Sequence, residues 1–485
     1  MLSLVRSTKN TFASINRIPP EVLSLIAHLR DKEDTDENLI ALTHVCRSWR
    51  EIFISHASLW TNLDCTIFDK TRVYLKRSKT SPLDIYLDEE DFLNDVFLLT
   101  VPHLNRLGSL FLSGPPDALP RLIKYLSSPS PLLRKLSLSV DGSEEVVLQD
   151  TFFGGDLSSL RELRLDGVIT NLAWENMSNL GTFVLLNVSA DKISVTQLLN
   201  FFERAPLLHS IRLQAALPSS SNAPPGRVVP LPNLKYLIII ALRLHTTLLN
   251  HLLVPTGAMI TQAFPFTDTK SPILFQLPKD LRNLQNISNV TSISIRFDSG
   301  PLLLFEGPSG GHKIICIWKG QGRISTNIGP RVIRSLDAFG VSAVEKLTIT
   351  HWQFTSPSVA VDKSPIYRIL HLMNSLRTLT LTACLNRPFV LALNPKKNPP
   401  GMVICPKLKQ LIVYAERKKL FCFGELLEMA KERAFRGAKL ETVTIMIIGA
   451  DPFLPVSDVL ELKTCVSHVE HSLNNVPHVG WGCPP

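Results

Sequence analysis

The sequence predicts an α/β protein in which a small all-helical segment precedes a long series of alternating strands and helices. Two observations predict this arrangement. Short apolar stripes at helical spacing occupy residues 15–62, and an apolar pattern typical of strands returns at intervals along most of the remainder. With 485 residues, of which 45% are hydrophobic and 19% charged, the chain is too apolar for global disorder. It is long enough for several domains or one long array.

The first predicted helix begins at Pro20, because proline suits a first helical turn, where its missing N–H would have no partner. Glu21 adds a negative charge near the positive end of the helix dipole. Apolar side chains then occur at spacings of three and four residues: Val22, Leu25, Ile26 and Leu29. This spacing places them in one stripe along one helix face.

Two further short helices are predicted before residue 62. Thr35, within an acidic stretch, is a suitable N-cap for the second helix, and the third carries Trp49. Three helices of this length form a very small core, which rarely folds with a wide margin. We therefore expect another surface to complete it, either the rest of the same chain or a partner.

This segment resembles an F-box, in particular the expanded fungal F-box families. The resemblance is carried by Ile18-Pro19-Pro20-Glu21-Val22, by Leu42-Thr43-His44-Val45-Cys46-Arg47-Ser48-Trp49 and by Leu59-Trp60, and the stretch 74–87 is similar to the segment after the F-box in those families. In that family the helices bind a Skp-type adaptor of a cullin ubiquitin ligase. The resemblance implies this docking surface: Ile18, Pro19, Pro20, Leu23, Ile26, Leu42, Val45, Cys46 and Trp49. The acidic spacer 31–37 departs from the family pattern and affects the register of these contacts.

Beyond residue 100 an apolar triplet at positions i, i+3 and i+5 recurs. Its copies begin at Leu107, Leu133, Leu160, Leu180, Leu208, Leu234, Val290, Val344, Leu376, Leu408 and Leu440. The triplet alone is common in so apolar a sequence, but successive copies are spaced 26, 27, 20, 28, 26, 56, 54, 32, 32 and 32 residues apart. The two wide gaps predict one degenerate copy each. A period of 20–30 residues is typical of leucine-rich-repeat-like solenoids.

Helical patterns lie between the triplets, so each unit is predicted to contain one strand and one helix. Ser194 and Gln197 form a capping box before one such helix, Pro365 opens another, and Gly437 is a C-cap for a third. An ordinary α/β domain with leucine-rich strands is the alternative. We favour the solenoid because the period persists and because no glycine-rich phosphate loop comes after a strand.

One face of each predicted strand is polar, and a solenoid would leave that face open for binding. The candidate target-binding residues on it are Glu162, Arg164, Asp166, Arg212, Lys346, Thr348, Thr378 and Thr380. Any solvated sheet face also carries polar residues, and this is the alternative for each of them.

We find no credible catalytic residues, metal ligands or cofactor-binding motif, and we predict that the chain is not an enzyme. Cys465, His468, His471, His478 and Cys483 cluster near the C-terminus, but their order matches no zinc pattern.

The net charge of +9 is dispersed along the chain, and a dispersed charge does not indicate nucleic-acid binding. The most apolar stretch, 234–254, is interrupted by four Lys, Arg and His residues, so no membrane span is expected.

These patterns predict five segments: a tail 1–14, the F-box 15–62, a linker or first capping repeat 63–100, the solenoid 101–450 and a C-terminal tail 451–485. We expect a substrate-recognition adaptor of an SCF-type cullin ubiquitin ligase that binds a Skp-type adaptor and an unknown target protein. A scaffold without a ligase role, whose F-box packs on its own repeats, is the alternative.

The eight cysteines lack a C-x-x-C pair, which favours the cytoplasm or nucleus. A mitochondrial presequence, less favoured, would also fit residues 1–20, which contain no acid.

Overall fold

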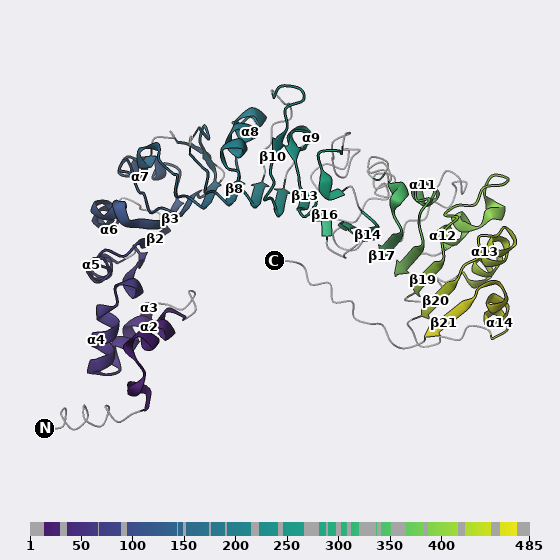
Figure 1. The fold of residues 1–485 in the computed structure, drawn as a ribbon, viewed down its shortest axis with the longest axis horizontal. Coiled ribbons are helices and arrows are strands. Elements are labelled where there is room, and N and C mark those ends of the chain that lie inside the picture. The colour runs from purple at the N-terminus through teal and green to yellow at the C-terminus, as the bar shows by residue number, and fades with distance from the viewer. Residues whose placement is uncertain are drawn as a thin grey trace. The chain divides into compact units, whose positions relative to one another are not determined.

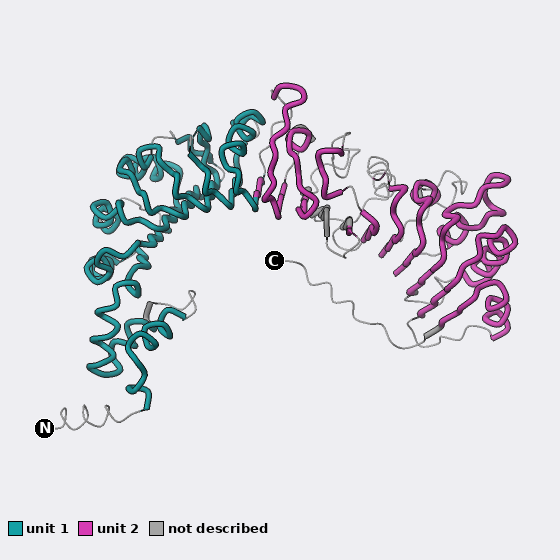
Figure 2. Tube along the Cα trace, viewed as in Figure 1, with its two compact units in different colours: residues 1–210, 214–216 teal, residues 211–213, 217–485 magenta. Residues whose placement is uncertain are grey.

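The structure of the protein is a computed structural model. It describes residues 14–29, 36–65, 67–88, 95–142, 144–148, 152–173, 176–189, 192–214, 223–240, 246–265, 281–287, 290–296, 302–307, 312–319, 336, 341–350, 365–382, 387–415, 422–447 and 456–472. The chain forms two compact units, residues 1–210 with 214–216 and residues 211–213 with 217–485 (Figure 2). Both are mixed α/β. Across the described ranges, no helix combines the length and the apolar character needed to cross a membrane.

Unit 1 opens with short helices. They are η1 (Ser14–Arg17), α2 (Pro20–His28), α3 (Asp36–His44), α4 (Arg47–Ser55) and η2 (Ala57–Trp60). The three predicted helices are therefore confirmed, and the first begins at the predicted Pro20. The predicted cap Thr35 lies outside the described residues.

A parallel sheet comes next in unit 1. Its strands, in spatial order, are β1 (Asn62–Asp64), β2 (Leu83–Asp88), β3 (Leu107–Gly114), β4 (Lys135–Val140), β6 (Glu162–Asp166) and β8 (Thr182–Leu186). The intervening elements are α5 (Phe68–Arg77), α6 (Asp95–Thr100), η3 (Val101–Arg106), α7 (Leu119–Ile123), η4 (Phe152–Gly155) and α8 (Val195–Arg204). Helices α5, α6 and α7 lie on one side of these strands (Figure 1). β5 (Val146–Val147) and β7 (Val168–Ile169) form a small separate pair. The sheet already begins with β1, at the boundary between the predicted F-box 15–62 and the segment 63–100 predicted as a linker or capping repeat, and β2 lies within that second segment.

Unit 2 contains a second run of strands. In spatial order they are β9 (Ser210–Gln214), β11 (Tyr236–Ile240), β13 (Met259–Pro265), β16 (His312–Lys319), β15 (Leu302–Glu306), β14 (Ser292–Arg296), β17 (Lys346–Thr350), β18 (Thr378–Thr382), β19 (Gln410–Ala415), β20 (Thr442–Ile447) and β21 (His468–Ser472). Its helices are α9 (Thr246–Leu249), α11 (Pro365–Leu372), α12 (Arg387–Leu393), α13 (Phe423–Phe435) and α14 (Val456–Cys465), with the short turns η5 (Gln285–Ile287), η6 (Val341–Ala343) and η8 (Pro395–Lys397). β10 (Val229–Pro230) and β12 (Leu252–Leu253) pair separately.

The predicted apolar triplets all coincide with strands. The second and third residues of every triplet are buried, as Leu136 and Leu138 in β4 illustrate with exposures of 1% and 0%. In ten of the eleven triplets the residue between them stays partly exposed, so these strands have one core face and one open face, whereas Thr444 in β20 is buried. Burial of these aliphatic rows beneath the helices forms the core of each unit.

The wide gaps between triplets hold more than the predicted degenerate copies. The first contains β13, parallel to β11, as expected for one hidden copy. The second contains β15 and β16, and β15 runs antiparallel to both of its neighbours, β14 and β16. β16 is parallel to β13, so this gap does contain one further parallel strand. The reversed strand β15 was not predicted, and this part of the sequence prediction is corrected.

The predicted capping box is present at the start of α8. The Gln197 amide donates to Ser194 Oγ at 3.2 Å, and the Ser194 amide donates to Gln197 Oε1 at 2.8 Å. The predicted C-cap also holds, since Gly437 after α13 has a φ of +75°, where glycine lacks the steric penalty of other residues.

Replacement of Ser194 by alanine is expected to lower the local stability of α8 by about 1 kcal/mol, because the Gln197 amide in the first turn loses its acceptor, Ser194 Oγ. Amide hydrogen exchange over the first turn of α8 measures this change. Ser457→Ala is the matched control, since the Ser457 hydroxyl near the start of α14 donates to the side chain of Asp458. If both substitutions change amide exchange in their own helices by the same amount, Ser194 does not stabilise α8 as an N-cap.

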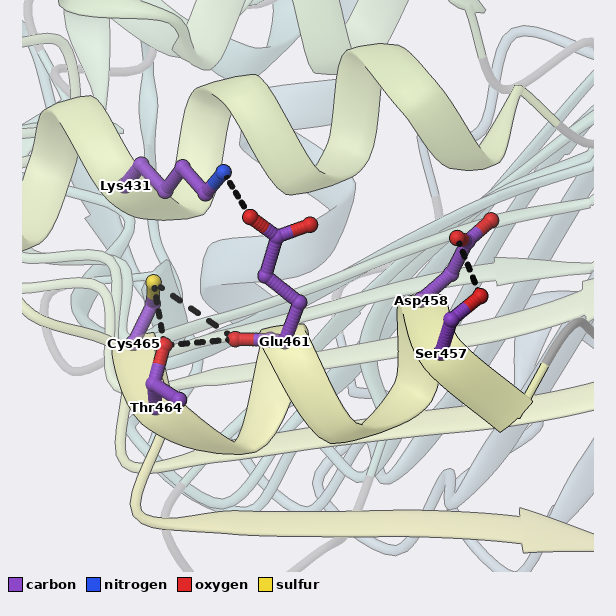
Figure 3. Close-up of polar contacts among 6 residues, drawn as sticks. All are labelled: Lys431, Ser457, Asp458, Glu461, Thr464 and Cys465. Atoms are coloured by element: carbon purple, nitrogen blue, oxygen red, sulfur yellow. Dashed lines mark hydrogen bonds and ion pairs between the residues drawn. The ribbon is translucent and has the colours of Figure 1, made fainter.

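The sheet of unit 2 continues past residue 450, where the sequence predicts a tail. β21 pairs in parallel with β20, and α14 precedes it. The Lys431 ammonium of α13 forms an ion pair with the Glu461 carboxylate of α14, and the two helices lie side by side (Figure 3). The predicted tail therefore includes a docked helix and a strand.

Candidate functional site

Helix α2 presents two different faces. Leu23, Ser24 and Ala27 are buried, with exposures of 3%, 1% and 3%. The opposite side carries the predicted apolar stripe, and its members are largely exposed: Val22 at 43%, Leu25 at 56%, Ile26 at 53% and Leu29 at 75%. Large aliphatic side chains grouped on an exposed helix face are typical of a protein-interaction surface. We call these four residues the α2 stripe.

Polar contacts fix the orientation of α2 and so the direction in which the stripe points. Ser24 Oγ donates to the Pro20 carbonyl oxygen at 2.8 Å and lies 3.1 Å from His56 Nδ1. One turn later His28 Nε2 lies 2.8 Å from Ser58 Oγ of η2. Two histidine–serine contacts thus hold α2 against the end of α4 and η2, and this leaves the α2 stripe facing solvent.

Helices α3 and α4 contribute further apolar surface. In α3, Ile40 is 39% exposed while Leu39 is fully buried, and Val45, just after the helix, is 55% exposed. Trp49 of α4 is half-buried, donates from Nε1 to Asn16 Oδ1 at 2.7 Å and packs edge-on against Phe53. Trp49 therefore joins η1 to α4 and keeps part of its ring accessible.

The nine residues predicted to dock an adaptor fall into three groups. Pro19, Pro20, Ile26 and Val45 are exposed, and Ile18, Leu42, Cys46 and Trp49 are partly exposed. Leu23 is buried on the inner face of α2, which contacts α4 and η2, so its predicted place on the surface is corrected. Val22, Leu25 and Leu29 were missing from the predicted set, although the helical spacing had already placed them on one stripe with Ile26.

The helical segment is anchored to the sheet through Trp60. This side chain is fully buried, and its Nε1 donates to the Phe53 carbonyl oxygen of α4 at 2.8 Å. Tyr74 of α5 packs edge-on at a centroid distance of 4.9 Å, and the Arg77 guanidinium lies 4.3 Å from the centre of the Trp60 ring. We call this group the Trp60 junction. It joins α4 to α5, which lies directly after β1.

The predicted target-binding residues lie on the partly exposed faces of their strands. In unit 1, the carboxylate of Glu162 pairs with Lys135 at 3.2 Å, and the Arg164 guanidinium pairs with Asp166 at 3.3 Å, so these charges are largely matched within the sheet. In unit 2, cross-strand register brings Lys346 and Thr348 of β17 beside Thr378 and Thr380 of β18. Arg212 is half-buried on β9.

The C-terminal histidine–cysteine cluster is only partly described, since His478 and Cys483 lie outside the described residues. Cys465 Sγ lies 3.8 Å from the Glu461 carbonyl oxygen of its own helix, and His468 Nε2 lies 3.1 Å from Glu470 Oε1 (Figure 3 shows the contacts of Cys465). Over the described part of the chain, no three side chains of His, Cys, Asp or Glu meet in a group that could hold a metal ion.

A family model matches the N-terminal part of the chain. No curated protein matches the chain. Residues 15–66 match the family described as F-box-like, a range that runs four residues past the predicted segment and includes α2, α3, α4, η2 and β1. F-box domains generally bind Skp-type adaptors, and the exposed α2 stripe lies within the matched range. Residues 15–66 therefore form an F-box-like domain, which supports a role for this chain as a protein-interaction adaptor.

Proposed function

We propose that this protein is the substrate-recognition subunit of an SCF-type cullin ubiquitin ligase. The F-box-like domain would bind a Skp-type adaptor, and through it the cullin, while the strands beyond it bind a target protein. The observation that carries the proposal is the exposed α2 stripe within residues that match an F-box-like family.

The α2 stripe has the character of an interface rather than of an ordinary surface. Full burial of a Val, Leu or Ile side chain contributes about 1.5–3 kcal/mol, so four such residues represent a large unused driving force. Part of it is offset by the entropy lost on association. Because Ser24 and His28 hold α2 through their contacts with His56 and Ser58, little further ordering is needed when a partner covers the stripe.

For the target-binding part, we propose a leucine-rich-repeat-like solenoid. Parallel strands at similar sequence intervals support this reading, each with one buried apolar row and one partly exposed face that is polar on most strands. The open faces of neighbouring strands form continuous rows, such as Thr348, Thr380 and Ile412. Rows of this kind provide an extended surface for another protein.

The proposal assigns no bond chemistry to this chain itself. Ubiquitin transfer would be performed by the other subunits of the ligase, and this chain would bring the target to them. We place the protein in the cytoplasm or nucleus, where such ligases act and where the scattered cysteines would remain reduced.

Co-purification with a Skp-type adaptor tests the proposal. The double substitution Leu25→Asp and Ile26→Asp is expected to weaken adaptor binding at least about 30-fold, because two apolar side chains are lost from the interface and two charges would be buried there. Both residues are more than half exposed in the chain, so folding should be preserved.

The matched control is Val147→Asp with Phe435→Asp, which changes two residues that are 71% and 86% exposed and lie outside the F-box-like domain. This variant should bind the adaptor like the wild type. If the wild-type chain itself does not bind the adaptor, the ligase role is wrong and the scaffold alternative gains support.

A further inference from the structure

Two aromatic rings stand on the open face of unit 1. Tyr86 of β2 and Phe111 of β3 are direct partners in the parallel ladder. Their rings stack at a centroid distance of 4.4 Å and an interplanar angle of 3°, and Tyr86 remains 42% exposed. Phe111 covers one face of the Tyr86 ring, and the other face is turned away from Phe111, toward β1, which pairs with the other edge of β2.

Three aspartates neighbour Tyr86 on β1 and β2. Asp84 and Asp88 lie two residues before and after it, on the same side of β2, and Asp64 of β1 is its cross-strand partner. Tyr86 Oη donates to Asp88 Oδ2 at 3.2 Å. Partial burial, and then Asp88 and Asp64, raise the pKa of Tyr86, which keeps the phenol protonated as a donor at neutral pH. We call Tyr86, Phe111, Asp64, Asp84 and Asp88 the acidic aromatic face.

The chain supplies little positive charge to this face. Lys70 lies 3.7 Å from Asp64. The next cation on the open face, Lys135 of β4, is paired with Glu162. In the described part of the chain, no lysine or arginine pairs with Asp84 or Asp88, and both aspartates are exposed. The face therefore combines a pre-stacked aromatic surface with negative charge that the described protein leaves largely unmatched.

We propose that the acidic aromatic face binds an arginine side chain in a basic segment of the target protein. A planar guanidinium can stack on the free face of Tyr86 and still direct N–H donors to carboxylates on either side. Charge-assisted hydrogen bonds to Asp84 and Asp88 would fix its position. Because the two rings already stack on each other, binding orders few additional groups. The identification of the ligand as a ligase target rests on the proposed function, whereas the binding of an arginine peptide does not.

Fluorescence anisotropy with the full-length chain tests this inference. The probe is a labelled short peptide in which arginines alternate with glycine and serine, and the reference peptide carries glutamate at each arginine position. We expect the arginine peptide to bind saturably and its affinity to fall when salt is added. We expect no binding of the glutamate peptide. Asp84→Asn with Asp88→Asn should weaken binding about 10-fold or more, and Tyr86→Ala about 5-fold or more.

Two further variants separate the acidic aromatic face from general effects. Tyr86→Phe keeps the ring and should bind within about 3-fold of the wild type. The double substitution Asp69→Asn and Asp117→Asn removes the same amount of charge outside this face. Both aspartates are exposed and pair with Arg72 and Arg121, respectively. This variant should bind the arginine peptide like the wild type.

Three results would overturn the inference: no saturable binding of the arginine peptide, equal binding of the glutamate peptide, or undiminished affinity of the Asp84→Asn, Asp88→Asn variant. Adaptor co-purification on the same samples verifies folding and separates the two proposals. If the wild-type chain binds the arginine peptide but not the adaptor, only the ligase role is overturned. If the wild-type chain binds the adaptor but not the arginine peptide, only the inference about the acidic aromatic face is overturned.

Discussion

Replacement of Trp60 by alanine is expected to lower the free energy of local unfolding of the F-box-like domain by about 4 kcal/mol. We expect this to be among the largest effects of any single substitution in unit 1. The side chain is fully buried, so its removal leaves a large cavity. It also removes the donor to the Phe53 carbonyl oxygen and the ring against which Tyr74 and Arg77 pack. Helices α2 to α4 should then open independently of the sheet.

Hydrogen exchange of the amides in α4 measures this effect directly, since a single global unfolding energy is not well defined for a chain with two units. Trp60→Phe is the informative control, because it keeps most of the apolar contact but loses the Nε1–H donor. It should cost about 1–2 kcal/mol. Unchanged exchange in α4 after Trp60→Ala would show that the Trp60 junction does not hold the domain.

The second large effect is expected at Arg433 in α13. Its side chain is fully buried, and its guanidinium donates to the carbonyl oxygens of Ile404 and Cys405 at 2.8 and 2.9 Å. Burial lowers the pKa of Arg433 to about 10, which leaves the group charged at neutral pH. Arg433→Met should destabilise this part of unit 2 by about 3 kcal/mol, because two buried acceptors lose their donors and Met cannot replace them.

Exchange of amides in α13 and β19 provides the readout. Arg436→Met is the control, since Arg436 directly follows α13 and pairs with Glu432 near the surface. Its loss should cost less than about 1 kcal/mol. A comparable effect of both substitutions would mean that the buried hydrogen bonds of Arg433 contribute little beyond helix packing.

Local patterns were sufficient to predict much of this fold. The spacing of Leu136 and Leu138, and of their counterparts in the other triplets, identifies strand cores because alternate residues on a strand share one face. The α8 capping box was equally predictable, since Ser194 and Gln197 interact within one turn. The same helical spacing predicted that the four residues of the α2 stripe share one face of the helix.

Features that depend on distant partners could not be predicted. The direction of β15 is set by pairing with β14 and β16, which its own residues do not reveal. β21 contains a single buried valine, Val469, too little for an apolar pattern. Leu23 was assigned to the surface because a helix sequence alone does not show which side meets α4. The stacking of Tyr86 on Phe111 likewise depends on the register between β2 and β3.

The Trp60 junction has a consequence for how a bound target would be presented. A flexible linker between the F-box-like domain and β1 would let a target sample many distances from the adaptor. Here η2 leads into β1 with only Thr61 between them, and Trp60 packs on both α4 and α5. A protein bound on β2 and β3 would therefore be held at a nearly fixed distance and orientation. We expect that geometry to restrict ubiquitin transfer to a small set of lysines on the target.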